Sequence, residues 1–473
     1  MNWKNIFKSL KSRDMQKRLL IVLGLIVAYR FLAHAPVPLA QPTELKQVLD
    51  NLLRSSDLGG FINLLSGGAL SSLSIVLVGL SPYITASVIT QLLTKAIPSL
   101  EELHKDGETG RRKIQQWTRL ITLPLAILQS VAFIFILRQT VLAGNTGVDI
   151  VANTSPLQWA TMITAMTAGS MLLMWLGELM TEQGVGNGMS ILIFAGIIAG
   201  FPNTFGTIIN SLFSFNSDAD KLHIFNWFTI PINWFALAIV AGLAAAGLIT
   251  LYLIVKINEA QRIINISYAK RVQGNRAYGG VTSILPVKLI TAGVIPVIFA
   301  VAFLALPAFI GQLLKGSHDA HWAQIGTNLA TWFQTPSTTT FLSGSMTTFI
   351  YPSLYFLLVV GFTYFYTSIV FNSNEIAENL QKQGGFVASI RPGIQTEKYL
   401  NSIVTRLTLF GSLALGIIAI LPFVTEYVLA QFGIQAQGLA IGGTGLLIVV
   451  SVTLETLRQI NSRALMVTYD QDY

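Results

Sequence analysis

Few side chains of this sequence could do chemistry within its long apolar segments. Glu178 and Glu182 stand one helical turn apart at the end of one such segment, and this spacing places both carboxylates on one helix face. We expect them either to solvate the helix end or to contact a basic loop. His318 and His321 have helical spacing in a polar segment that is expected to be an external loop. Two histidines make a weak metal site, so no metal site is predicted.

The glycine motifs predict turns rather than catalysis. Gly107-Glu-Thr-Gly110 lies in a basic segment and is typical of a turn. Gly184-Val-Gly-Asn-Gly188 precedes an apolar helix and lacks the preceding strand of a nucleotide-binding fingerprint. The chain has no cysteine and no Walker A motif, which excludes thiolate chemistry and ATP hydrolysis by a P-loop. No carboxylate or histidine relay crosses the apolar segments, so we predict no catalytic residue and no cofactor.

The fractions of apolar and charged residues indicate the class of protein to which this chain belongs. Of the 473 residues, 52% are apolar and 11% are charged, whereas a soluble domain carries about 25% charged residues. A disordered chain would combine low hydrophobicity with high charge, which is the opposite of this composition. The sequence therefore predicts an all-α membrane protein that crosses the bilayer several times.

Ten segments are long and apolar enough to span a bilayer, since a spanning helix needs about 20 mostly apolar residues. They are Leu19–Ala33, Leu58–Thr94, Leu120–Leu137, Ile150–Gly177, Gln183–Ser217, Leu222–Val255, Leu289–Leu314, Ala320–Asn374, Leu407–Thr425 and Tyr427–Leu454. The first resembles a signal peptide, but we interpret it as a span because nine others follow. Four prolines are expected to kink helices: Pro124, Pro286, Pro296 and Pro307.

The basic residues predict the orientation. With ten spans, 24 of the 30 Lys and Arg residues fall on one side, which should be the cytoplasmic side and should hold both termini. Five spans lie in residues 1–213 and five in residues 225–473, joined by a polar connection at 214–224. Because five is odd, two structurally similar halves would run in opposite orientations.

The second apolar segment is too long for one helix. Leu58–Thr94 contains 37 residues without a charge, and Leu73–Leu93 is its best spanning helix. The preceding Gly- and Ser-rich stretch, Gly59–Leu70, is left over. Non-helical backbone at membrane depth survives only inside protein or along a water-filled cavity. The surplus is therefore either a re-entrant element in a pore or an interfacial helix on the outer surface, and the residues alone leave both open.

Two basic loops, at about 256–288 and 372–406, are the largest polar pieces. Apolar and polar residues alternate near Ile263–Tyr268, which favours a protruding hairpin. In the other loop, Arg391 precedes Pro-Gly, a turn that would expose its guanidinium group. These cations either only set the topology or also bind an anionic partner such as RNA or an acidic protein surface.

Motifs along almost the whole chain carry a resemblance, and they occur in the order of one family. They are Ser66-Gly-Gly-Ala-Leu70, Pro82-Tyr-Ile-Thr-Ala-Ser87, Gln91-Leu-Leu93, Gly107-Glu-Thr-Gly-Arg-Arg-Lys-Ile114, Met174-Trp-Leu-Gly-Glu178, Gly184-Val-Gly-Asn-Gly-Met-Ser190, Tyr268-Ala-Lys-Arg271, Leu285-Pro-Val-Lys288, Ala292-Gly-Val-Ile-Pro296, Ile390-Arg-Pro-Gly393, Thr405-Arg-Leu-Thr408 and Gly442-Gly-Thr-Gly-Leu-Leu-Ile448. Together they resemble the SecY translocon family. The resemblance implies ten transmembrane helices in two inverted five-helix halves around an hourglass pore, with a re-entrant plug at about 60–72.

The resemblance also implies site residues. The apolar pore ring would be Leu80, Ile84, Met189, Ile193, Ile298 and Ile448. The plug would contain Phe61, Ile62, Asn63, Leu64, Leu65, Ser66, Gly67 and Gly68, and Gln91 would be a polar residue of a lateral gate. The residues that dock a partner would be Arg262, Lys270, Arg271, Arg276 and Arg391. Spacing agrees in part, because Leu80 and Ile84, like Met189 and Ile193, share a helix face.

The implied function is a passive protein-conducting channel in the bacterial cytoplasmic membrane. Its implied partners are the SecE and SecG subunits, the SecA ATPase, the ribosome, signal peptides and nascent polypeptides, membrane lipid and the YidC insertase. Two other classes fit less well. A secondary transporter would place ionisable residues within its spans, and a membrane enzyme would need a catalytic pair at matching depth. Neither feature is present among the predicted spans.

Overall fold

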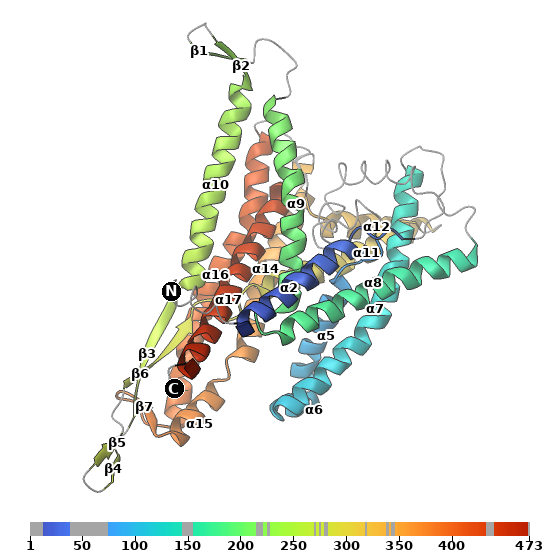
Figure 1. Ribbon diagram of the computed structural model, residues 1–473. Coiled ribbons are helices and arrows are strands. Elements are labelled where there is room, and N and C mark those ends of the chain that lie inside the picture. The colour runs from blue at the N-terminus through green and yellow to red at the C-terminus, as the bar shows by residue number, and fades with distance from the viewer. Residues whose placement is uncertain are drawn as a thin grey trace. The chain divides into compact units, whose positions relative to one another are not determined.

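The computed structural model of the chain is mostly helical (Figure 1). The residues that it describes are 13–37, 74–143, 155–213, 221–224, 228–268, 271–273, 276–278, 282–316, 319–336, 340–341, 346–431 and 439–471. The predicted plug residues and Lys270 lie outside this part of the chain. Contacts divide the chain into two compact units, which we describe separately. Unit 1 contains residues 1–248, 302–351 and 422–473, and unit 2 contains residues 249–301 and 352–421.

Each of the ten predicted spans overlaps a helix of the described chain. In order these helices are α2 (Arg13–Leu32), α5 (Ser81–Ala96), α7 (Glu108–Ala143), α8 (Pro156–Glu182), α9 (Gly188–Phe213), α10 (Trp234–Glu259), α11 (Ile295–Lys315), α14 (Ile350–Val370), α16 (Ile394–Gln431) and α17 (Leu439–Gln471). Within the described residues, five segments satisfy strict length and hydropathy criteria for a membrane span, and they include α7, α8, α11, α14 and α16. The fold is that of an all-α membrane protein.

Shorter elements occupy the connections. The helical ones are α6 (Pro98–Lys105), α12 (Ala320–Phe333), η2 (Met346–Phe349) and α15 (Ser373–Lys382). One hairpin, β1 (Lys221–Ile224) and β2 (Phe228–Asn233), precedes α10. His321 was expected in an irregular external loop, but it lies in the first turn of α12. His318 is outside the described residues.

The second span begins later than predicted. The sequence predicts a helix from Leu73 to Leu93, but Ser74 forms a β-bridge with Pro36, residues 75–80 form turns, and α5 starts only at Ser81. Gly79 adopts φ +64°, a left-handed conformation that glycine accepts without strain. Pro82 follows in the first turn of α5, where its missing N–H removes no helical hydrogen bond. The chain therefore turns just before the helix that carries Ile84.

A β-hairpin follows α10, as the alternating pattern predicted. β3 (Gln261–Tyr268) pairs antiparallel with β6 (Thr282–Lys288), and Ile263 lies opposite Pro286. A smaller hairpin, β4 (Arg271–Gln273) and β5 (Arg276–Tyr278), lies between them in the sequence. The expectation that Pro286 kinks a helix is wrong. Pro286 lies in β6, which is an edge strand, and an edge strand can accommodate a residue without an N–H donor.

A third strand links the two basic loops. β7 (Gly385–Val387) belongs to the second loop and pairs with the far half of β3, so that Ile266 lies opposite Val387. Beneath this sheet lies an apolar core that both loops and α16 supply: Ile264, Val287, Val387, Leu400, Ile403 and Val404. Segments more than 100 residues apart therefore form one module of unit 2, which we call the loop sheet (Figure 1).

Candidate functional site

The predicted ring residues of α5 and the segment before it are buried in unit 1. Leu80 and Ile84 are one turn apart, and the N–H of Ile84 donates to the carbonyl of Leu80 at 3.0 Å. The hydroxyl of Ser170 in α8 donates to the carbonyl of Gly79 at 3.1 Å. A Cβ at Gly169 would collide with the backbone at Ile75. The turn that presents Leu80 is therefore packed directly against the backbone of α8.

The α8–α9 corner positions the next two ring residues, Met189 and Ile193. Asn187 caps α9, because its Oδ1 accepts from the backbone N–H groups of Met189 and Ser190 at 3.1 and 3.3 Å. Ile193 is buried, and Met189 is half-buried. A Cβ at Gly177 of α8 would collide with the sulfur of Met189. Met189 therefore packs directly against Gly177 of α8, and a larger residue at position 177 would displace the flexible end of Met189.

The last two ring residues lie in different units. Ile448 is buried in α17 of unit 1, and Ile298 is buried in α11 of unit 2. Within unit 1, α17 packs against α9, the helix of Met189 and Ile193. The structure thus places five of the six residues in one compact unit. That all six form one ring remains a prediction.

Gln91, the predicted gate residue, lies near the end of α5. Its side-chain amide donates to Ser87 Oγ one turn earlier, at 3.2 Å. Its Oε1 is buried and accepts no hydrogen bond from the residues that the structure describes. A buried amide oxygen without a donor is costly. This unpaired oxygen does not test the predicted role of Gln91 in a lateral gate, which stays a prediction.

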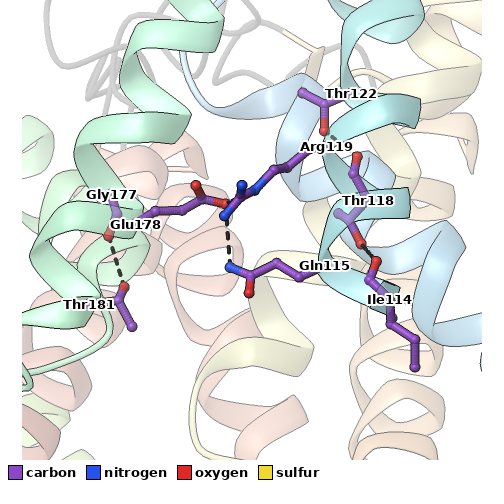
Figure 2. Close-up of polar contacts among 8 residues, drawn as sticks. All are labelled: Ile114, Gln115, Thr118, Arg119, Thr122, Gly177, Glu178 and Thr181. Carbon is purple, nitrogen blue, oxygen red and sulfur yellow. Dashed lines mark hydrogen bonds and ion pairs between the residues drawn. The ribbon is translucent and has the colours of Figure 1, made fainter. Parts of the chain in front are cut away.

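Glu178 has a role that favours the second of the two interpretations of its sequence position. Its carboxylate accepts from Arg119 Nε of α7 at 2.7 Å and from the amide of Gln115 at 3.3 Å (Figure 2). The side chain of Glu178 is 10% exposed and that of Arg119 is 45% exposed. The pair joins α7 to α8 rather than solvating a helix end. Glu182, one turn later, is exposed.

Two further cations hold the loop between α8 and α9, and sequence reasoning missed both. Arg18 of α2 donates to the carbonyl of Gln183 at 3.1 Å. The guanidinium group of Arg463 in α17 packs against Gly184, which adopts φ +64°. These contacts lie at the carboxyl end of α8, where unpaired carbonyls and the helix dipole favour positive charge. Nothing in the sequence connects residues so far apart.

The described docking residues lie on the loop sheet and on the separate small hairpin β4–β5. Arg262 is exposed at the start of β3, and Arg391 is exposed just before the turn at Pro392-Gly393. The carbonyl of Arg391 accepts from the hydroxyl of Thr396 at 2.9 Å, which fixes the backbone of this turn. Arg271 and Arg276 belong to the small hairpin β4–β5. The pairing of β7 with β3 brings the strands that adjoin Arg262 and Arg391 into one sheet.

The described residues contain no cluster of three or more His, Asp or Glu side chains that could hold a metal ion. The site is thus made of apolar helix faces, helix-joining ion pairs and exposed basic loops. It can form a constriction and a binding surface.

Comparison with known proteins agrees with this picture. The SecY family model matches residues 74–457. Protein translocase subunit SecY of Streptomyces coelicolor is 40% identical over 468 residues, which cover 98% of each chain. The same subunit of Mycobacterium tuberculosis is 37% identical over 468 residues, again covering 98% of each chain.

Solved structures resemble the chain at the level of the fold. The match to a structure described as that of a protein conducting channel has a TM-score of 0.57 at 19% identity and covers 94% of this chain and 91% of the other. Sec61 in a canine ribosome–channel complex matches with a TM-score of 0.54 at 18% identity, over 94% and 91% of the two chains. Family model, near full-length relatives and fold agree, and the chain belongs to the SecY family of protein translocase subunits.

Proposed function

We propose that the chain is the pore-forming subunit of a Sec translocase in a bacterial cytoplasmic membrane. It would pass unfolded secretory polypeptides across the bilayer and would itself catalyse no reaction. The observation that carries this proposal is the match to SecY subunits over 98% of the chain, combined with the channel fold. The distribution of Lys and Arg supports cytoplasmic termini.

The buried ring residues give this proposal a mechanism. Leu80, Ile84, Ile193, Ile298 and Ile448 are apolar and buried, and Met189 is a flexible apolar side chain. A narrow apolar collar resists water and ions by dewetting and can widen around a peptide. We propose that these six residues form the collar, that residues 60–72 plug it, and that hydrophobic segments leave sideways to lipid past Gln91.

The loop sheet is the proposed docking module. Because β7 pairs with β3, the two basic loops cannot move independently without breaking backbone hydrogen bonds. A partner that binds Arg391 in one loop and Arg262 at the base of the other would therefore act on α10, α11 and α16 together. SecA or a translating ribosome would supply the driving force, and SecE, SecG and the YidC insertase would be membrane partners.

Depletion of the chain from cells tests the channel function. Secretory precursors should accumulate in the cytoplasm with their signal peptides uncleaved. The matched control is depletion rescued by the intact gene, which should restore processing. If exported proteins mature normally while the uptake of one solute fails, the chain is a transporter and the proposal is wrong.

Charge reversal tests the docking role. Arg391→Glu should impair precursor translocation and reduce the binding of SecA or ribosomes to membranes that contain the chain. Lys398→Glu is the control, because Lys398 is exposed nearby on α16 and has no proposed contact. Equal effects of both changes would indicate a general loss of positive charge rather than a specific role of Arg391.

A further inference from the structure

The helix α12 has three distinct faces, and it lies in the first part of the predicted segment Ala320–Asn374, ahead of the spanning helix α14. Its fourteen residues, AHWAQIGTNLATWF, include no Asp, Glu, Lys or Arg. With about 3.6 residues per turn, the small residues Gly326 and Ala330 fall on one face and are buried. His321, Gln324, Asn328 and Thr331 fall on a polar face and are all exposed.

The third face is apolar and large. It comprises Trp322, Ile325, Leu329, Trp332 and Phe333. Trp322 is 50% exposed and Trp332 is 42% exposed, and the other three are half-buried. A face of this kind beside a separate polar face is typical of a helix that lies in a membrane interface. Tryptophan is enriched at that depth because its ring is apolar and its N–H is polar.

Packing fixes α12 against α11, an apolar helix long enough to span the membrane. A Cβ at Gly326 would lie 2.7 Å from the carbonyl carbon of Leu314, and a Cβ at Gly311 would lie 2.6 Å from the backbone nitrogen of Ala330. Two glycines thus let the backbones meet. As α12 advances from Gly326 to Ala330, its contacts move back along α11 from Leu314 to Gly311, so the chain turns back beside the end of α11.

This geometry sets the depth of α12. Lys315 ends α11 and marks the level at which the chain leaves the apolar region. Phe333 is seven residues beyond Gly326, so at about 1.5 Å per residue it lies no more than about 10 Å below the level of Leu314. An interfacial helix buries its apolar face about 5–10 Å into the boundary between headgroups and acyl chains. Ile310 and Leu313, near the end of α11, are exposed apolar residues as well.

The hydroxyl groups of α12 are also suited to this position. Thr327 Oγ1 donates to the carbonyl of Ala323, and Thr331 Oγ1 donates to the carbonyl of Thr327, both at 3.0 Å. A hydroxyl that bonds to its own helix needs no water, which lowers the cost of placing it near lipid.

We propose that α12 is an interfacial helix that binds membrane lipid. Its face of Trp322, Ile325, Leu329, Trp332 and Phe333 lies at the boundary of headgroups and acyl chains, and its polar face lies toward water. The helix anchors the end of α11 to one leaflet. This inference rests on the membrane fold and does not depend on the translocation proposed above.

Site-specific labelling tests the proposal. The chain contains no cysteine, so Trp322→Cys and Gln324→Cys each provide one site for an environment-sensitive fluorophore in the full chain, reconstituted in phosphatidylcholine–phosphatidylglycerol vesicles. Both positions are exposed, but they face about 160° apart. The label at 322 should be quenched several-fold more by nitroxide lipids than the label at 324, and iodide should show the reverse order.

A second pair, Trp332→Cys and Thr331→Cys, repeats the test at the other end of α12 and covers the case in which one variant does not fold. Equal quenching by iodide at 322 and 324 would place both faces in water and overturn the proposal. Protection of the label at 322 from both quenchers would mean that protein covers this face, which would also overturn it.

Discussion

The α8–α9 corner of unit 1 and the loop sheet of unit 2 both carry cations of the predicted cytoplasmic side, but they use them differently. At the corner, Arg119, Arg18 and Arg463 are directed at groups of neighbouring helices. On the loop sheet, Arg262 and Arg391 are exposed, and an ion pair such as Lys382–Glu378 joins residues of one helix. The first set connects helices, and the second is available to a partner.

The difference shows that an excess of positive charge does not by itself define a docking surface. A cation that bridges helices lowers the free energy of the folded state, and its loss should destabilise the protein. A cation that is exposed on a sheet adds little to stability, because exposed ion pairs contribute about 0–1 kcal/mol. Removing a cation of the α8–α9 corner should therefore lower stability, whereas removing an exposed cation of the loop sheet should lower partner binding and leave stability nearly unchanged.

Gly188→Ala should have the largest effect on stability. An added Cβ would lie 2.7 Å from the Cβ of Met180 and 2.8 Å from the backbone nitrogen of Thr181. It would also disturb the hydrogen bond from the Gly188 N–H to Thr181 Oγ1, which is 2.9 Å long. Because the obstructing atoms are largely backbone, we expect a loss of about 3 kcal/mol or more, measured by thermal unfolding of the purified protein.

The control is the same substitution elsewhere in α9. A Cβ at Gly200 would meet nothing within 4 Å, and alanine favours a helix by up to about 1 kcal/mol over glycine. Gly200→Ala should therefore leave the unfolding temperature unchanged or raise it. Similar destabilisation by both changes would show that the corner is no tighter than the rest of α9.

Much of the fold follows from the sequence because hydrophobic length is a strong signal. Each of the ten apolar segments overlaps a helix, and the alternating pattern at Ile263–Tyr268 lies in a strand. The start of the second span was wrong because hydropathy does not distinguish a helix from turns that pack against another helix, as residues 75–80 do against α8. The helix α12 was not predicted as a separate element, because the charge-free segment Ala320–Asn374 that contains it was counted as a single span.

The site was less predictable, since its contacts join distant parts of the chain. The i, i+4 spacing correctly placed Leu80 one turn from Ile84, but it could not show that Met189 packs against Gly177. Glu178 stood out as a carboxylate in a charge-poor segment, yet its partner Arg119 is 59 residues away. Nothing local marks Arg463 as a contact of Gly184. Such pairs are determined by tertiary packing alone.

Glu178→Ala should have the second largest effect. It removes the carboxylate that accepts from Arg119 and Gln115 and leaves a half-buried guanidinium group without this partner. Hydrogen bonds to charged groups contribute about 1.5–3 kcal/mol, and partial exposure of Arg119 reduces the cost, so we expect a loss of about 2 kcal/mol. Glu182→Ala, one turn away and exposed, should change thermal stability by no more than about 0.5 kcal/mol. If both substitutions lowered the stability equally, the contact of Glu178 with Arg119 would not explain the effect.

Arg463→Ala should cost less, about 1 kcal/mol, because it removes favourable charge near the carboxyl end of α8 and packing against Gly184. The matched control is Arg406→Ala, which removes an exposed cation of unit 2. High salt should narrow the difference between the two variants, since it screens the interaction with the helix end. If Arg406→Ala proved the more destabilising, cations of unit 2 would also hold helices together.

Arg391→Ala should have the smallest effect on stability, although Arg391 has a central place in the proposed function. Its side chain is exposed, whereas its backbone carbonyl holds Thr396 through a bond that any residue can make. Substitutions of this kind change stability by about 0.5 kcal/mol or less. Unfolding temperature and partner binding should be measured on the same preparation, and only binding should fall. A loss of stability comparable to that of Glu178→Ala would mean that Arg391 stabilises the loop sheet itself. Weak translocation by the Arg391→Glu protein would then result from a destabilised loop sheet rather than from the loss of a contact with the partner.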